Sequence, residues 1–379
     1  MAFSRTLQHI AAIGFSVSCY AALSAGAQAQ PEVVAGPAAQ PKCFAPWAAD
    51  TQFFKFPKKA GPYRIALANG YIANTWRIQM IQTAKAYAAQ PEVAAKLKEF
   101  KVVSTGEDVP AQISAINNFI DSGYDAIVVN AQNPTAFGPV IKRAKEAGVV
   151  LVAFDNILDT KDAINVNVDQ KGLGVLWANW IVKHVPDGGK VLEVRGVAGT
   201  SVDTDRHNGI HETLDASGKK WQVTEVVGKW DDGVAQKATA DAIATSGPFA
   251  AITGQGGDTG IVQAMMDAKH PMVPFGGETE NGFRKFCAAH AGDGLKCSSA
   301  GTGPAQVAVA IKTAIAALDG EVVPQSVKLP LAIVEDPNFK AGQDYFPDQS
   351  DNFFVGNSFP TCGINFTAQE IMGQSKENQ

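Results

Sequence analysis

The sequence predicts an α/β protein of two doubly wound lobes with mostly parallel sheets. The 379-residue chain is 46% hydrophobic and 18% charged, which is enough apolar material for sizeable cores, and its length suggests two or three domains. Short β-branched runs alternate with longer amphipathic stretches, which is typical of βαβ units. The pair GYDAIVVN and AGVVLVAFDN is echoed later by GPFAAITG and KHPMVPFGGE, so we predict two similar lobes.

Residues 1–29 are predicted to be a signal peptide. Arg5 and His9 precede the apolar stretch IAAIGFSVSCYAAL, and Ala27-Gln28-Ala29 forms the small-x-small pattern of a cleavage site. This stretch is shorter than the roughly 20 apolar residues of a membrane-spanning helix. We therefore expect export, followed by an N-terminal extension over residues 30–60 with an extended conformation.

The elements of the first lobe are expected to begin at Gly61. Strands are predicted over 64–69, 101–105, 125–130, 149–155 and 163–168, with helical stretches after the first, second and third of them. The rhythm restarts in the second lobe with strands over 190–196, 221–228, 249–254 and 272–277 and helices around 205–216, 233–246 and 258–269. Pro304 opens another helix, SVKLPLAIVED is expected to form one strand, and residues 338–379 are expected to pack over a lobe surface.

Four cysteines remain once Cys19 leaves with the signal peptide. An even number in an exported protein predicts two disulfides, for which three connectivities are possible. We favour Cys287–Cys297 across a short loop and Cys43–Cys362 between the two terminal extensions. A metal site built from these cysteines is the competing interpretation, and their spacing does not favour it.

Composition and motifs exclude several function classes. The chain has 32 basic and 37 acidic residues, a formal charge of -5, and no basic run, so nucleic acid is not an expected partner. A G-x-G-x-x-G after the first strand, a phosphate-binding loop and a G-x-S-x-G elbow are all missing from the sequence. We therefore predict no cofactor and no enzymatic activity. The six histidines are expected to be ordinary surface or core residues, and no metal site is predicted.

The candidate binding residues follow the predicted strands, because parallel sheets bind ligands at the carboxyl ends of their strands. These residues are Asn74, Trp76, Asp155, Asn156, Arg206, Trp230, Asp231 and Asp258. Indoles pack on the C–H faces of sugars, while Asp, Asn and Arg exchange hydrogen bonds with hydroxyls, so the set suits a polyhydroxylated ligand. Simpler roles stay open: both tryptophans in the core, Arg206 in a surface ion pair, and Asp258 as a helix cap.

The stretches KVLEVRGVAGTSVDTDRHNGIHETL, IALANGYIANTW and GKWDDGVAQ resemble periplasmic sugar-binding proteins of ABC importers. The resemblance is to the ribose-binding branch with the type I periplasmic-binding fold, and it covers roughly residues 62–335. It implies ligand contacts from the candidate residues above and two lobes joined by a three-segment hinge, with crossovers near Val168-Asp169, Thr302 and Gln325. The lobes would then be 61–168 plus 302–325 and 169–301 plus 326–337, with 338–379 as a C-terminal extension.

The sequence departs from the family pattern at three places in the site. The Asn-Asp usual before the helix near residue 258 reads Gly257-Asp258. Phe275 is followed by Gly276-Gly277, so the carboxylate usual there is missing, and Glu278 or Glu280 is expected to replace it. Arg77 occupies the place of a second aromatic residue in the first loop.

The resemblance implies a monomeric periplasmic solute-binding protein that captures a sugar, sugar alcohol or derivative and delivers it to an ABC importer permease. A secreted carbohydrate-processing enzyme on the same fold and a ligand-sensing partner of a chemoreceptor or histidine kinase are the alternatives.

Overall fold

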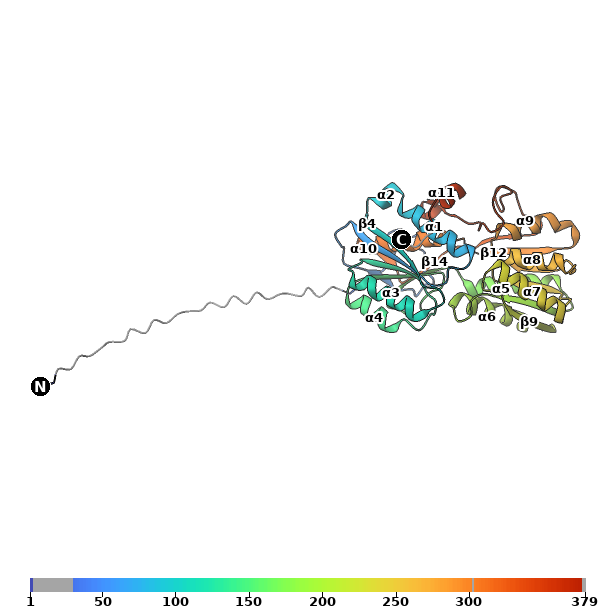
Figure 1. Cartoon of the computed structure of the whole chain (residues 1–379), viewed down its shortest axis with the longest axis horizontal. Helices are drawn as coiled ribbons and strands as arrows, with labels where there is room; N and C mark the ends of the chain where they lie inside the picture. Colours follow the sequence, from blue (N-terminus) through green and yellow to red (C-terminus); the bar gives the residue numbers. More distant parts are fainter. Residues whose placement is uncertain (3–29, 302, 377–379) are drawn as a thin grey trace.

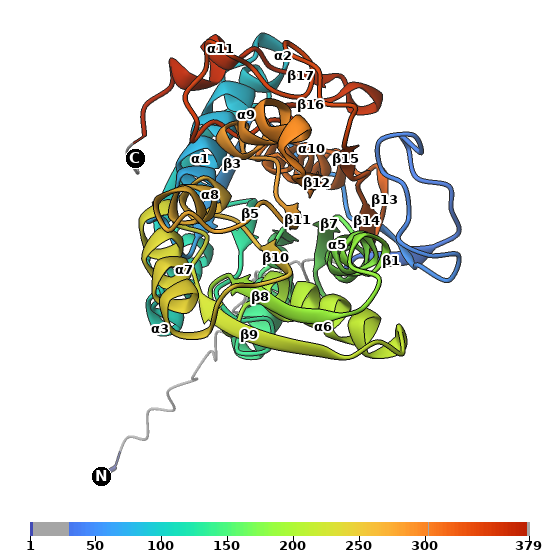
Figure 2. The ribbon, with the colours of Figure 1, turned by 90° about the vertical axis from the view of Figure 1, so that its right-hand side faces the viewer.

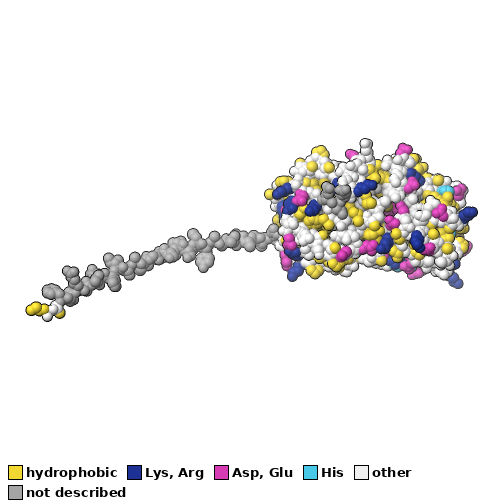
Figure 3. All heavy atoms as spheres, in the orientation of Figure 1, with side chains coloured by type: hydrophobic (Ala, Val, Ile, Leu, Met, Phe, Trp, Pro, Cys, Tyr) yellow, Lys and Arg dark blue, Asp and Glu magenta, His cyan; other side chains and the backbone are white. Residues whose placement is uncertain are grey.

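Two lobes lie side by side in the computed structural model, which describes residues 1–2, 30–301 and 303–376 (Figure 1). Each lobe contains a six-stranded sheet with helices on both faces. The predicted signal peptide lies almost wholly outside the described residues, and so does the crossover residue Thr302. No helix among the described residues combines the length and apolarity needed to cross a membrane. On the face shown in Figure 3, basic and acidic side chains are interspersed.

The first lobe is built on a fully parallel sheet in the order β14-β7-β6-β5-β3-β4. Its strands are β3 (Tyr63–Asn69), β4 (Leu97–Ser104), β5 (Ala126–Asn130), β6 (Val150–Phe154), β7 (Ile164–Asn167) and β14 (Ser326–Lys328). Its helices are α1 (Thr75–Ala88), α2 (Pro91–Ala94), α3 (Val109–Asp121), α4 (Gly138–Glu146) and α10 (Gln306–Leu318). Every residue of β5 and β6 is buried, because a parallel sheet is covered on both faces and its strands become continuous apolar runs.

The second lobe repeats this design in the order β15-β12-β11-β10-β8-β9. Its strands are β8 (Gly189–Arg195), β9 (Trp221–Val227), β10 (Ala251–Gly254), β11 (Pro274–Gly277), β12 (Lys296–Gly301) and β15 (Ala332–Glu335), of which only β15 is antiparallel to its neighbour. Its helices are α5 (Gln170–His184), α6 (Ser201–Ala216), α7 (Asp232–Ser246), α8 (Asp258–Asp267) and α9 (Asn281–His290), with a 3-10 turn over Ala291–Asp293. In both sheets the chain order reverses at the first strand, β3 or β8, which is where ligands bind in open α/β sheets.

One predicted strand and one predicted crossover between the lobes differ from the structure. SVKLPLAIVED is divided between β14, which pairs with β7 in the first sheet, and β15, which pairs with β12 in the second. Residues 326–328 therefore belong with the first sheet, and the chain crosses between sheets over 329–331 rather than near Gln325. Pro330 lies in this crossing, where its missing N–H removes a ladder donor.

The N-terminal extension is more structured than predicted. β1 (Glu32–Val34) and β2 (Phe53–Lys55) form a three-stranded sheet with β13 (Val322–Pro324). Phe44 is fully buried and belongs to the same hydrophobic core as α1 and α10. The extension is therefore part of the first lobe's packing.

The C-terminal segment contacts both lobes, and its elements β16, β17 and α11 lie along the top of the view in Figure 2. Phe353 O accepts a hydrogen bond of 2.8 Å from Asn281 N in α9, and the backbone of Phe354 exchanges two hydrogen bonds with Gln79 of α1. Beyond it lie β16 (Ser358–Phe359), a 3-10 turn (Pro360–Cys362), β17 (Ile364–Asn365) and α11 (Ala368–Met372). The segment therefore spans the two lobes outside the three crossovers.

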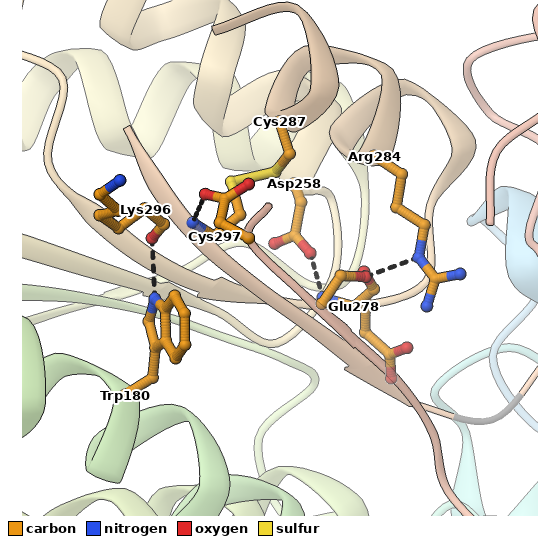
Figure 4. Close-up of a disulfide and its surroundings, with 9 residues drawn as sticks. Trp180, Asp258, Glu278, Arg284, Cys287, Lys296 and Cys297 are labelled. Atoms are coloured by element: carbon orange, nitrogen blue, oxygen red, sulfur yellow. Dashed lines mark hydrogen bonds between the residues drawn. A yellow bond between two sulfur atoms is a disulfide. The ribbon is translucent and has the colours of Figure 1, made fainter. Parts of the chain in front are cut away.

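Both predicted disulfides are present. Cys43–Cys362 joins the N-terminal extension to the C-terminal segment, with Cα atoms 4.6 Å apart. Cys287–Cys297 ties α9 to β12 beneath the second sheet, as Figure 4 shows. The two terminal extensions are thus covalently linked on the first lobe.

Candidate binding cleft between the lobes

A cavity of about 430 Å³ lies between the carboxyl ends of the two sheets. Five of the eight candidate residues line it, namely Asn74, Trp76, Asp155, Arg206 and Trp230, and so does Glu278, one of the two glutamates expected to supply the missing carboxylate. They come from both lobes, because each follows a strand or begins a helix at the edge where the two sheets face each other.

The first lobe contributes a buried arginine–carboxylate pair. Arg77 donates to Asn69 Oδ1 at 2.7 Å, and its guanidinium lies 3.7 Å from Asp155 Oδ2. Burial lowers the pKa of Arg77 to about 10, opposed by the charge of Asp155, so the side chain remains protonated at neutral pH. Asp155 Oδ1 also accepts a hydrogen bond from Gln306 Nε2 at 3.2 Å.

The second lobe contributes a matching pair. Arg206 donates through Nη2 to Glu278 Oε1, through Nη1 to Gln255 O at 2.7 Å, and through Nε to Gln170 Oε1 at 2.9 Å. Burial raises the pKa of Glu278, while the charge of Arg206 opposes the rise. Two cationic and two acidic side chains therefore line the cavity and balance each other, which favours an uncharged ligand over an ion.

Three buried polar atoms of the cavity residues have no hydrogen-bond partner among the described residues. They are Trp230 Nε1, Gln255 Oε1 and Gln306 Oε1. An unpaired buried polar atom costs about 1–3 kcal/mol, and native structures contain few of them. One donor and two acceptors are thus left for a ligand that both accepts and donates hydrogen bonds, as a hydroxyl group does.

The Trp230 ring packs closely against the backbone at two glycines. A Cβ at Gly196 would lie 2.1 Å from the Trp230 ring, and one at Gly256 would lie 3.1 Å from it, so glycine is required at both positions. Trp230, its neighbour Lys229 and Asp155 all adopt left-handed backbone conformations, with φ between 55° and 58°. Such conformations in non-glycine residues cluster at binding sites.

Three candidate residues do not line the cavity: Asn156, Asp231 and Asp258. Asn156 is fully buried and accepts a hydrogen bond at 3.2 Å from the backbone N–H of Val202 in the opposite lobe. Asp258 is also fully buried, and its Oδ2 accepts from the backbone N–H of Glu278 at 2.5 Å (Figure 4). The helix cap expected at Asp258 is instead Gly257. Asn156 therefore joins the lobes, and Asp258 holds the backbone at Glu278. Asp231 is the N-cap of α7, and its Oδ1 accepts a hydrogen bond from Val234 N at 2.9 Å.

Only one of the two glutamates expected to supply the missing carboxylate lies at the cavity. Glu278 lines the cavity, whereas Glu280 accepts hydrogen bonds from Gly257 N at 2.6 Å and from the N–H and hydroxyl of Thr259. Glu280 therefore faces the start of α8. Burial raises its pKa to about 8, and the charge of Asp232 adds to the rise.

Sequence reasoning missed several cavity residues: Arg77 as a lining residue, Gln170, Gln255, Gln306 and Phe354. Gln255 directly follows β10, and Gln170 and Gln306 begin helices, so the rule that selected the other residues also applied to them. Phe354 had no such signal, because the C-terminal segment brings it to the cleft from far along the chain.

Two of the histidines, expected from the sequence to be ordinary residues, lie together beside a buried glutamate. His207 and His211 are four residues apart on α6, and both contact Glu193 at 3.1 and 2.9 Å. This pair lies outside the cavity residues.

A family model described as a periplasmic binding protein domain matches residues 65–321. The D-ribose/D-allose-binding protein of Pseudomonas aeruginosa is 32% identical over 179 residues, which are 44% of this chain and 54% of the relative. The xylitol-binding protein of Mycolicibacterium smegmatis is 28% identical over 182 residues, 46% of this chain and 51% of the relative. The chain thus spans about half the length of the curated relatives it matches.

Solved structures share the fold. An ABC transporter solute binding protein from Thermobispora bispora has a TM-score of 0.71 at 24% identity, covering 79% of this chain and 92% of its own. The Caulobacter myo-inositol binding protein has a TM-score of 0.64 at 18% identity, covering 75% and 96%. The family match, the two similar lobes and the cleft at their facing edges agree: this chain belongs to the periplasmic binding protein domain family and has the type I periplasmic-binding fold.

Proposed function

We propose that this protein is a solute-binding protein that captures an uncharged polyhydroxylated ligand, a sugar, sugar alcohol or derivative, between its lobes. The observation that carries the proposal is the charge-balanced cavity with three unpaired polar atoms, between the indoles of Trp76 and Trp230. Indoles suit the C–H faces of such a ligand, and the unpaired atoms suit its hydroxyls. The relatives named for ribose, allose and xylitol are consistent with this class of ligand.

The captured ligand would be enclosed by closure of the lobes. Two hydrogen bonds that join the lobes at the cleft support this step: Val202 N donates to Asn156 Oδ1, and Ile157 N donates to Ser201 Oγ at 3.0 Å. At the cleft edge Lys229 pairs with Glu107 at 2.8 Å. A ligand that contacts both lobes binds the closed form better than the open form and shifts the population toward it.

The proposed role is transport without chemistry. The chain would act as a monomer in the periplasm after removal of residues 1–29 and deliver the ligand to the permease of an ABC importer. The cavity's two carboxylates, Asp155 and Glu278, are each engaged by an arginine of their own lobe. This engagement favours binding over acid–base catalysis, which requires a carboxyl group able to exchange its proton with the ligand.

The test is to identify what the protein carries and whether it changes it. Protein purified from its source is denatured, and the released small molecules are identified by mass spectrometry and nuclear magnetic resonance. The proposal expects one intact polyol, recovered unchanged after incubation with native protein. Conversion of that polyol into a product would instead establish an enzyme on this frame.

A further inference from the structure

A cluster of two histidines and two glutamates lies on the second lobe, outside the cleft. His207 and His211 are one turn apart on α6 and therefore share a helix face. Glu193 of β8 and Glu225 of β9 are direct partners in the parallel ladder, so their side chains leave the same face of the sheet. Helix and sheet thus place two imidazoles opposite two carboxylates.

The distances within this cluster are short. His207 Nδ1 lies 3.1 Å from Glu193 Oε2 and 3.9 Å from Glu225 Oε2. His211 Nε2 lies 2.9 Å from Glu193 Oε2 and 3.7 Å from Glu225 Oε1. One ligand atom from each residue falls within 4.8 Å of all the others. Tetrahedral zinc with bonds of about 2.0–2.1 Å separates its ligand atoms by about 3.3 Å, so small side-chain shifts would complete the coordination.

The charge of the cluster favours a bound cation. Glutamates side by side on adjacent strands repel each other, and Glu193 is fully buried. Arg195 lies near, but it divides its guanidinium between Glu225 at 3.0 Å and Asp203 at 2.7 Å. Gln255 Nε2 reaches Glu193 only at 3.5 Å. The two histidines therefore face carboxylate charge that the neighbouring side chains neutralise in part.

We propose that Glu193, Glu225, His207 and His211 form a binding site for a divalent cation of the zinc class. Imidazole nitrogen and carboxylate oxygen are ligands that Zn²⁺ accepts in tetrahedral sites. Ca²⁺ requires six to eight oxygen ligands and Mg²⁺ an octahedral oxygen shell, so neither matches two imidazoles. The side chains of His207 and His211 are 22% and 30% exposed, and that of Glu225 is 40% exposed, so an ion can enter from solvent.

The ion would fasten α6 to β8 and β9. α6 also carries Arg206, the residue before His207, which reaches the cleft and bonds Glu278. The site would therefore stiffen the helix that presents Arg206, without contacting the captured ligand. Without an ion, a proton shared with Glu193 would occupy the same place, and the hydrogen bond to Glu193 does raise the pKa of His211.

The test is calorimetric titration of ZnCl₂ into the full, untagged chain after removal of metals by a chelator. We expect one Zn²⁺ per chain and an increase in thermal stability. The His207→Ala/His211→Ala variant should lose Zn²⁺ affinity by more than the roughly 10–100-fold that loss of an outer-shell contact causes. His290→Ala is the matched control, because His290 pairs with Asp293 on the surface of the same lobe; it should bind Zn²⁺ as the wild type does.

Two results would overturn the site. One is no Zn²⁺ binding by the wild-type chain, which would leave a cluster held by a shared proton. The other is wild-type affinity in the double variant, which would place the ion elsewhere. If the double variant fails to fold, Glu225→Ala replaces it, since this side chain is partly exposed, and loss of the tetrahedral visible absorption of bound Co²⁺ in that variant decides the question.

Discussion

Replacement of Trp230 by phenylalanine is the sharpest test of the cleft, because it removes the indole N–H and keeps an aromatic ring. The Trp230 N–H is buried and has no partner among the described residues, while the ring packs against Gly196 and Gly256. Phenylalanine keeps an aromatic face at the cleft and deletes the donor. Trp230→Phe should therefore weaken ligand binding while leaving the unliganded fold as stable as before, or slightly more stable.

The magnitude follows from the value of one hydrogen bond. A net contribution of about 0.5–1.5 kcal/mol corresponds to a loss of affinity of about 2- to 13-fold. Trp230→Ala should lose more, because it also removes the aromatic face. Calorimetric titration of the bound polyol measures affinity, and urea unfolding measures stability.

Trp221→Phe is the matched control for this experiment. Trp221 begins β9, the strand whose other end leads to Trp230, and its Nε1 donates to Ser217 Oγ at 2.8 Å. Its replacement should cost stability and leave affinity unchanged. Equal affinities of wild type and Trp230→Phe, or a fold weakened by Trp230→Phe as much as by the control, would refute the assignment of this donor to a ligand.

Three further predictions concern the residues behind the cleft and the extensions. Burial raises the pKa of Asp258 well above its ordinary value, and Glu280 adds to the rise; the folded protein therefore holds a proton that the unfolded chain releases. The free energy of unfolding should fall as the pH rises above the ordinary pKa of an aspartate, about 3.9, by up to about 1.4 kcal/mol per unit for one proton, and a slope in Asp258→Asn as steep as in the wild type would contradict this. Asn156→Ala should favour the open form and reduce affinity by up to about tenfold, seen as a larger radius of gyration in solution scattering without ligand; an unchanged radius would argue against its role in closure. Cys43→Ser/Cys362→Ser should lower the free energy of unfolding by about 2–5 kcal/mol in urea titrations, and equal stability with and without this disulfide would show that the extensions are held by packing alone.

The strands of both lobes could be predicted because parallel strands buried on two faces have continuous apolar runs. β5 and β6 are wholly buried and were evident in the sequence. α5 was missed, since its buried residues include Leu173, Trp177 and Ile181 on a segment with glycines and little amphipathic period. β12 was missed because KCSSAG is small and polar, and it becomes a strand through pairing with β11 and β15.

The cleft residues could be predicted where they follow strands, and this rule located Asp155 and Trp230, whereas Glu278 was expected only as one of two glutamates that the family resemblance suggested. The rule could not say which side chains point into the cavity. Asn156, next to Asp155, turns toward the other lobe, because its oxygen accepts from the Val202 backbone. Phe354 reaches the cavity through hydrogen bonds to Gln79, a long-range contact for which the local sequence contains no signal.

Variants of Arg206 or Asp155 would disturb the fold as well as the cleft. Both residues bond other side chains of the cavity. Removing Arg206 would leave Glu278 as an uncompensated buried charge, which costs several kcal/mol. Loss of binding in such a variant therefore mixes weakened folding with lost contact, whereas Trp230→Phe separates the two.

Thermal unfolding in the presence of pentoses, hexoses, sugar alcohols and inositols tests the central claim most directly. A ligand that binds only the folded state stabilises it by RT ln(1 + [L]/Kd), about 2.7 kcal/mol at a hundredfold excess over Kd. At least one polyol should raise the melting temperature by several degrees in the wild type and by less in Trp230→Ala. A melting temperature unmoved by every polyol, or moved equally in both proteins, would contradict binding in this cleft.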